Sequence, residues 1–125
     1  MKQVLIIVCM SMALTGCQTY QQKLDDQGMK KLSGAELQSM MSSNYSIRFK
    51  TQNTSGTAQY KTDGSATGQW NGSDHEGSWY VEGDAYCTKW DGSSKANCYQ
   101  LYEKTDGVFT AVNADGSYKG EYTRE

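Results

Sequence analysis

The chain has 125 residues, with 12 basic and 14 acidic side chains and a formal net charge of −2. The basic residues form no stripe, which excludes the electrostatic surface that a nucleic-acid-binding protein needs. The length suffices for one domain around one small hydrophobic core, and not for two. We therefore expect every functional residue to lie on a single small domain, with no nucleic acid among its partners.

The first 16 residues have the pattern of a secretory signal peptide. Lys2 precedes an apolar run from Val4 to Leu14, and small residues follow this run. The run is shorter than the roughly 20 apolar residues that are needed to cross a bilayer. We predict that residues 1–16 are removed during export.

The residues Leu14-Thr15-Gly16-Cys17 resemble the lipobox of bacterial lipoproteins, in which a peptidase cuts before a cysteine that carries a diacylglyceryl group. The resemblance implies a lipidated Cys17, and each acyl methylene buried in the membrane would contribute about 0.8 kcal/mol to anchoring. Gln18 is not the Asp that marks inner-membrane retention in many such lipoproteins. We therefore expect anchoring in the outer membrane, facing the periplasm. The alternative is an ordinary secreted protein with a chance cysteine near its cleavage site.

The mature chain divides into two parts. Residues 17–31 are polar and have no apolar period, so we predict a lipidated, flexible tether there. Residues 32–125 form the single β-rich domain of the prediction.

A short helix is expected at the start of this domain. Ser33 is a suitable N-cap, Glu36 is its reciprocal partner, and Leu32 with Leu37 forms a hydrophobic staple. We predict a helix from about Gly34 to Met41, with its apolar side against the sheet.

From Tyr45 the hydrophobic period changes from 3.6 to 2, which is typical of strands with one exposed face. Asp-Gly or Asn-Gly pairs recur along the remainder and supply the positive φ of tight hairpin turns. We predict strands near 45–50, 56–62, 65–70, 76–82, 85–90, 97–103, 108–113 and 117–123. An antiparallel meander of about eight strands predicts a barrel or a sandwich, lipocalin-like in outline.

One pattern occurs twice in this region. Residues 63–70 and 115–122 share the sequence D-G-S-x-x-G-x-aromatic. We interpret each copy as a turn followed by a strand, in which glycine permits close approach and the aromatic side chain fills the core.

Two cysteines remain after Cys9 in the signal peptide and the lipidated Cys17. Cys87 and Cys98 should be bonded to each other in an oxidising periplasm. A zinc site would need two more ligands, and His75 is the one histidine of the chain. We predict no metal and no cofactor.

Catalytic motifs are absent from the sequence. Any Ser-His-Asp or Cys-His arrangement would have to use His75, which lies between Asp74 and Glu76 in a polar segment. We predict that His75 lies in a solvated turn, so that His75→Ala changes the free energy of unfolding by at most about 0.5 kcal/mol. An envelope enzyme that acts through converging carboxylates remains the alternative, because acidic residues distant in sequence could meet in space.

The aromatic residues offer a possible binding platform. Trp70, Trp79 and Trp90 could stack on a sugar, peptide or lipid. Strands are rich in aromatic residues in any case, so we expect each ring to pack in the core. The parity that Trp79 shares with Gly77 and Val81 places it on the inward face.

Several motifs resemble a bacterial family catalogued as domain of unknown function 995. The similarity comprises residues 32–37, Asp63-Gly64-Ser65 with Gly68, the pattern G-x-W-x-V-x-G-D-x-x-C-x-x-W over residues 77–90, and Cys98-Tyr99. The resemblance implies a small secreted or lipid-anchored protein, and it implies no activity, cofactor or catalytic residue.

A second resemblance is confined to residues 65–70. This stretch is similar to the Ser-Ala-Ser-Gly-x-x-aromatic loop of the membrane-bound inhibitors of C-type lysozyme, and it departs from that pattern at Thr67. The similarity implies that Ser65 and Thr67 would contact lysozyme.

Our main prediction is a non-enzymatic protein that binds an unknown envelope component, whether glycan, peptide or protein, or has a structural role there. Lysozyme inhibition is the alternative binding function.

Overall fold

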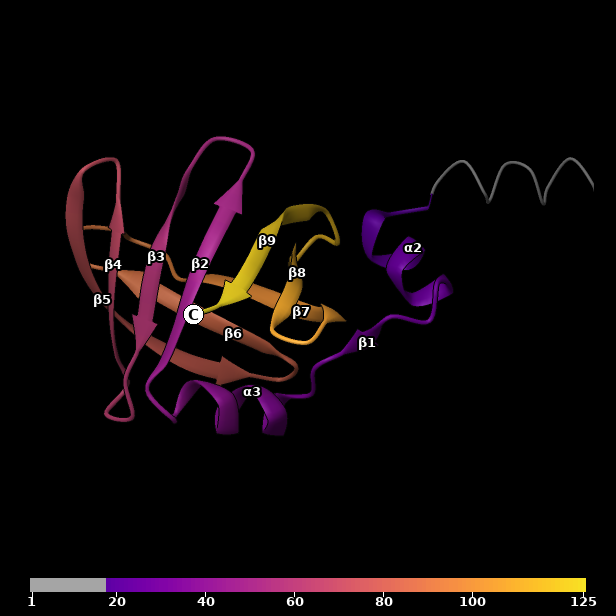
Figure 1. The fold of residues 1–125 in the computed structure, drawn as a ribbon, viewed down its shortest axis with the longest axis horizontal. Helices are drawn as coiled ribbons and strands as arrows, with labels where there is room; N and C mark the ends of the chain where they lie inside the picture. The colour runs from indigo at the N-terminus through magenta and orange to yellow at the C-terminus, as the bar shows by residue number, and fades with distance from the viewer. Residues whose placement is uncertain (1–17) are drawn as a thin grey trace, which may run out of the picture.

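The computed structural model describes residues 18–125, which form a nine-stranded sheet with two short helices (Figure 1). In chain order the elements are α2 (Tyr20–Asp26), β1 (Lys30–Lys31), α3 (Gly34–Met41), β2 (Tyr45–Thr51), β3 (Ser55–Tyr60), β4 (Ser65–Trp70), β5 (Ser73–Glu82), β6 (Ala85–Trp90), β7 (Asn97–Thr105), β8 (Val108–Asn113) and β9 (Tyr118–Arg124). All eight predicted strands are present. The predicted signal peptide and Cys17 lie outside the described residues.

Strands β2 to β9 close into a barrel. Each pairs antiparallel with the next along the chain, and β9 returns to pair with β2. The closing pairs run from Ile47 opposite Arg124 to Thr51 opposite Gly120. The architecture is therefore a closed eight-stranded antiparallel barrel and not a sandwich. Closure pairs the two edges that an open sheet would expose.

The repeated D-G-S pattern forms the same turn twice. In the first, the backbone N–H and hydroxyl of Ser65 donate to Asp63 Oδ1 at 2.9 and 2.6 Å. In the second, Ser117 donates to Asp115 Oδ1 at the same two distances, 2.9 and 2.6 Å. These bonds, the hydroxyl bond first, lower the pKa of both aspartates below the ordinary value. The glycine between the two residues has a φ of 89° in the first turn and 87° in the second, a conformation that glycine adopts readily.

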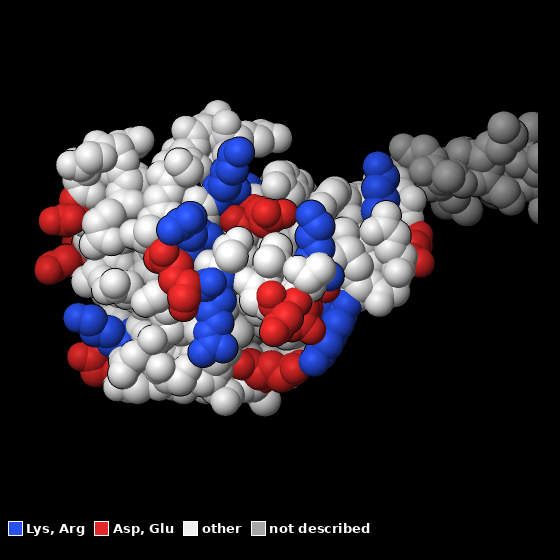
Figure 2. Space-filling view, viewed as in Figure 1, with Lys and Arg blue, Asp and Glu red and all other residues white. Residues whose placement is uncertain are grey.

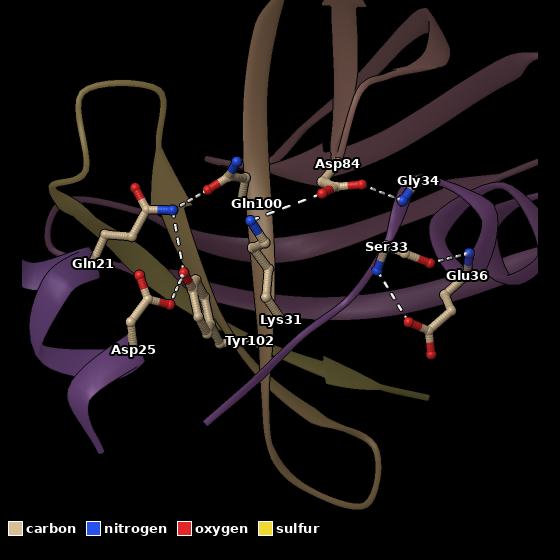
Figure 3. A network of polar contacts seen from close by, with 9 residues as sticks. All are labelled: Gln21, Asp25, Lys31, Ser33, Gly34, Glu36, Asp84, Gln100 and Tyr102. Carbon is tan, nitrogen blue, oxygen red and sulfur yellow. Dashed lines mark hydrogen bonds and ion pairs between the residues drawn. The ribbon is translucent and has the colours of Figure 1, made fainter. Parts of the chain in front are cut away.

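Helix α3 covers one end of the barrel (Figure 1). Its predicted capping box is confirmed, since Glu36 N–H donates to Ser33 Oγ at 3.1 Å and Ser33 N–H donates to Glu36 Oε1 at 3.0 Å. Leu37 and Met41 are fully buried in the core. The backbone N–H of Gly34 donates to Asp84 Oδ1 at 2.9 Å, which ties the helix start to the turn after β5 (Figure 3).

The N-terminal segment differs from the flexible tether predicted for residues 17–31. Its described part forms α2 and β1, and β1 pairs with β7. Thr19 and Gln22 form a capping box, and Leu24 is buried against Tyr102 and Val112. The sequence gives little sign of this docking because Leu24, Tyr20 and Met29 are widely spaced in a polar segment, and the partners of Leu24 lie on distant strands.

Polar contacts also hold α2 on the outer wall of the barrel (Figure 3). The Tyr102 hydroxyl donates to Asp25 Oδ1 at 2.7 Å and accepts from Gln21 Nε2 at 3.2 Å. Gln21 also donates to the side chain of Gln100. Burial, together with the bond to Asp25, raises the pKa of Tyr102 above its ordinary value.

Charged side chains of both signs alternate over the face drawn in Figure 2, with no large patch of one sign. Within residues 18–125 there are four ion pairs, one of which joins Arg48 to Glu125 at 3.1 Å. In residues 18–125, the helices are too short and too polar to span a membrane.

Candidate binding site at the open end of the barrel

A cavity of about 300 Å³ opens at the end of the barrel away from α3. It lies among the β2–β3 turn, the ends of β4 and β6 and the starts of β7 and β9. Seven aromatic side chains line it: Phe49, Tyr60, Trp70, Tyr86, Trp90, Tyr99 and Tyr122. Trp70 and Trp90, two of the three tryptophans named as possible platform residues, line this cavity, whereas the sequence predicts that each ring packs in the core. A volume near 300 Å³ is at the small end of the usual range for ligand cavities.

Glycines in the barrel wall make room for the two tryptophans. A Cβ on Gly68 would lie 2.3 Å from Trp70 Cζ3 and 3.1 Å from the Trp90 ring. A Cβ on Gly77 would lie 2.9 Å from the backbone of Trp90. The two indoles meet edge to face, with centroids 4.9 Å apart. The small residues of the G-x-aromatic pattern thus let indole rings lie against the wall.

The inner part of the cavity contains the hydroxyl groups of Tyr86 and Thr88, which lie near the Tyr60 hydroxyl but make no hydrogen bond of normal geometry to it. The side chains of Tyr86 and Thr88 are 1% and 3% exposed. Neither hydroxyl makes a hydrogen bond of normal geometry to any described residue. A buried hydroxyl left in this state costs about 1–3 kcal/mol, so the pair is an exception that calls for a physical reason.

The tyrosine hydroxyls around this cavity stay protonated at neutral pH. Burial raises the pKa of Tyr60 to about 12. Burial also raises the pKa of Tyr86 and of Tyr122 well above the ordinary value. Each phenol therefore remains able both to donate and to accept a hydrogen bond.

The rim of the cavity has one cation. Lys119 lines the opening, with Nζ 5.4 Å from the centroid of the Tyr99 ring. Among residues 18–125, those that line the cavity include no Asp, Glu or His.

Trp79 does not belong to this site. Its side chain is 6% exposed in the main core, and its Nε1–H donates to the Lys61 carbonyl at 2.8 Å. The inward parity predicted for it is confirmed, and the structure places it away from the cavity lining.

His75 is not in a solvated turn, so that prediction is wrong. It lies within β5, which begins three residues earlier than predicted, and faces Gly68 of β4 across the pairing. Its ring stacks on Trp70 with centroids 3.8 Å apart and planes 9° from parallel. Its Nε2 is buried without a hydrogen-bond partner among the described residues. The missing side chain of Gly68 leaves room for the Trp70 indole on which His75 stacks, and the local sequence around His75 does not reveal this.

Ser65 and Thr67 do not lie in a protruding loop. Both belong to β4, which is paired with β3 on one side and β5 on the other. Ser65 donates to Asp63, and Thr67 donates to Gln59 Oε1 at 3.3 Å. The wall position of residues 65–70 gives the lysozyme-inhibitor alternative no loop to insert into a cleft.

The disulfide between Cys87 and Cys98 is present, as predicted. It joins directly opposed residues of β6 and β7, the two strands that carry Trp90 and Tyr99. The Glu82 carboxylate lies near both sulfurs, but bonded sulfurs offer no thiolate to a metal ion.

Three acidic residues, Glu36, Glu103 and Asp106, line a shallow groove of about 530 Å³ between α3 and the β7–β8 turn, together with Lys30 and Arg124. Glu36 is held by the capping box and by Lys30 Nζ at 2.9 Å. The Ser33 backbone and Lys30 lower its pKa, so Glu36 is ionised at neutral pH and unsuited to act as an acid.

No family model, curated protein or solved structure matches this chain. The resemblance to the domain of unknown function 995 therefore stays a prediction.

Proposed function

We propose that this protein is a lipid-anchored envelope protein that binds a small aromatic molecule in the open end of its barrel. The observation that carries the proposal is the pair of unpartnered hydroxyls, Tyr86 and Thr88, inside an aromatic cavity. A ligand with a polar group on its inner edge would hydrogen-bond to them and remove the cost of their burial. Its ring would lie against Trp70 and Trp90.

The lining of the cavity favours binding over catalysis. In the described part of the chain, the lining contributes aromatic rings, hydroxyls, amides and one lysine, with no carboxylate or imidazole to transfer a proton at neutral pH. A few directed polar groups in an aromatic wall are typical of a recognition site.

The location in the envelope rests on the lipobox. Only Gln18 and Thr19 separate Cys17 from α2, which is packed on the barrel wall. A lipid on Cys17 would therefore hold the barrel close to the membrane surface and not at the end of a long tether.

The ligand proposal is tested by calorimetric titration of the folded protein with 2-naphthol, indole and naphthalene-2-carboxamide. We expect at least one of them to bind with a stoichiometry of one. Thr88→Val should weaken that binding severalfold and raise the free energy of unfolding by about 1 kcal/mol, because it removes an unpartnered hydroxyl. Thr123→Val, on the exposed end of β9, is the matched control and should change neither. Binding that is absent for all three probes, or indifferent to Thr88→Val, would overturn the proposal.

The anchor is tested by Cys17→Ser. The variant should leave the membrane fraction and lose labelling by a palmitate analogue, because the thioether is the one predicted lipid site. A variant that stays in the membrane pellet and is still labelled would contradict the lipoprotein assignment.

A further inference from the structure

The position of Lys119 results from an irregularity in the barrel wall. From Val108 to Ala111, the residues of β8 pair regularly with β9, and Ala111 lies opposite Gly120. The next residue, Val112, lies opposite Tyr118, so Lys119 is the extra residue of a β-bulge. A bulge shifts the alternation of side chains and redirects them.

The bulge separates two neighbouring side chains. Regular alternation from Gly120 and Tyr122, both buried, would direct Tyr118 inward and Lys119 outward. Instead Tyr118 lies on the outer surface against Tyr20 of α2, with ring centroids 5.2 Å apart. Lys119 lines the mouth of the cavity.

Lys119 is the one charged residue in the described lining of the cavity. It takes part in none of the ion pairs of residues 18–125. Its ammonium group lies over the Tyr99 ring, 5.4 Å from the ring centroid. The chain as a whole is acidic, with a formal net charge of −2, so overall charge does not draw anions to it. A local, unpaired cation at the mouth is therefore a specific feature of this site.

The side chains that line the cavity favour an aromatic ligand over an aliphatic one. The rings of Phe49, Trp70, Trp90 and Tyr99 present flat faces and edges, whereas Ala58 is the one aliphatic residue in the described lining. Aromatic rings pack well against such walls by stacked and edge-to-face contacts. A long acyl chain would gain less here and exceed a cavity of about 300 Å³.

We propose that the ligand is a small aromatic carboxylate, with its carboxylate at Lys119 and its ring beside Trp70 and Trp90. This inference rests on the proposed function and adds the charge and shape of the ligand. The Lys119 ammonium would donate a charge-assisted hydrogen bond to the carboxylate, and the hydroxyls of Tyr86 and Thr88 would meet a polar group at the opposite end of the ring.

The test compares two naphthalene compounds of nearly the same shape, 6-hydroxynaphthalene-2-carboxylate and 6-hydroxynaphthalene-2-carboxamide, by calorimetry at pH 7; each has a hydroxyl at the end opposite the carboxyl group for Tyr86 and Thr88. The wild-type protein should bind the carboxylate about tenfold more tightly than the amide, the effect of one charge-assisted contact at a solvated rim. Lys119→Gln should remove this preference and leave the affinity for the amide within about twofold. Lys89→Gln, which changes an exposed lysine on the outer face of β6, should preserve the preference.

The outcomes separate the two proposals. If neither naphthalene compound binds the wild-type protein, the carboxylate assignment fails, and if 2-naphthol, indole and naphthalene-2-carboxamide do not bind either, the proposed function fails with it. If the amide binds as tightly as the carboxylate, or if Lys119→Gln weakens both alike, the small-molecule function stands and the carboxylate assignment is wrong. Octanoate serves as the aliphatic anion, and tighter binding of octanoate than of the hydroxynaphthoate would reject the aromatic ligand.

Discussion

The two ends of the barrel are packed differently. At the end covered by α3, Leu37 and Met41 are fully buried, and the helix cap satisfies its own backbone donors. At the open end, glycines face indole rings, and the hydroxyls of Tyr86 and Thr88 are buried without partners. The Tyr45 hydroxyl near α3 is also buried without a partner, so the open end is set apart by its aromatic cavity, a departure from close packing that is common at ligand sites.

The comparison gives a rule for the effect of substitutions. Removal of side chains near the closed end should reduce stability and leave the open cavity intact. Changes at the open end should alter ligand binding with smaller, and in places favourable, effects on stability.

The largest effect is expected for Trp79→Ala. It removes a nearly buried indole from the main core and leaves the Lys61 carbonyl without its 2.8 Å donor. The free energy of unfolding, measured in urea, should fall by about 3–5 kcal/mol. Tyr80→Ala is the control, because Tyr80 is 45% exposed on the other face of the same strand. A similar loss in both variants would mean that Trp79 is no special part of the core.

Reduction of the disulfide should have the next largest effect. The bond joins opposed residues of β6 and β7 and closes a loop between positions 11 apart in sequence. Reduction, or the double replacement of Cys87 and Cys98 by serine, should lower the free energy of unfolding by about 2–4 kcal/mol. Because these strands carry Trp90 and Tyr99, ligand affinity should fall as well. Two free thiols in protein purified from the periplasm would contradict this prediction.

Gly68→Ala tests whether the missing side chain of Gly68 makes room for the Trp70 indole at the open end. The new methyl group would lie 2.3 Å from Trp70 Cζ3, so the indole must move, at a cost of about 1–3 kcal/mol. Near-ultraviolet circular dichroism should report the altered tryptophan environment. In the background of Trp70→Phe the same substitution should cost much less, because the clashing ring atom is gone. An equal loss in the free energy of unfolding in the two backgrounds would mean that Gly68 does not make room for the Trp70 ring.

Much of the fold follows from local signals in the sequence. The eight strands were predicted from alternation and from Asp-Gly and Asn-Gly turns, and α3 was predicted from its capping box. These signals act over a few residues, so they can be recognised without the tertiary structure. Barrel closure depends on β2 meeting β9, a pairing between distant residues that alternation alone leaves open.

The site was predictable only in part. Trp70 and Trp90 were candidates by residue type, whereas Tyr86, Thr88 and Lys119 were not recognised. The unpartnered state of a hydroxyl depends on every neighbour in space. The direction of Lys119 depends on a one-residue shift between β8 and β9. Regular alternation of inward and outward side chains, counted from the buried Tyr122, would have placed Lys119 on the outer face. The local sequence therefore does not predict that Lys119 lines the cavity.

The smallest effect is expected at His75, a partly buried residue of β5 at the open end. His75→Ala removes a ring stacked 3.8 Å from Trp70, worth about 0.5–1.5 kcal/mol for an aromatic pair. It also removes the buried, unpartnered Nε2, which returns part of that cost. We expect a net loss near 0.5 kcal/mol in urea unfolding, together with a weaker aromatic signal in near-ultraviolet circular dichroism. His75→Phe keeps the stack without the nitrogen and should match or exceed wild-type stability. If the alanine and phenylalanine variants are equally destabilised, the stack contributes nothing, and Trp70 is held in place by Trp90 and Phe49 alone.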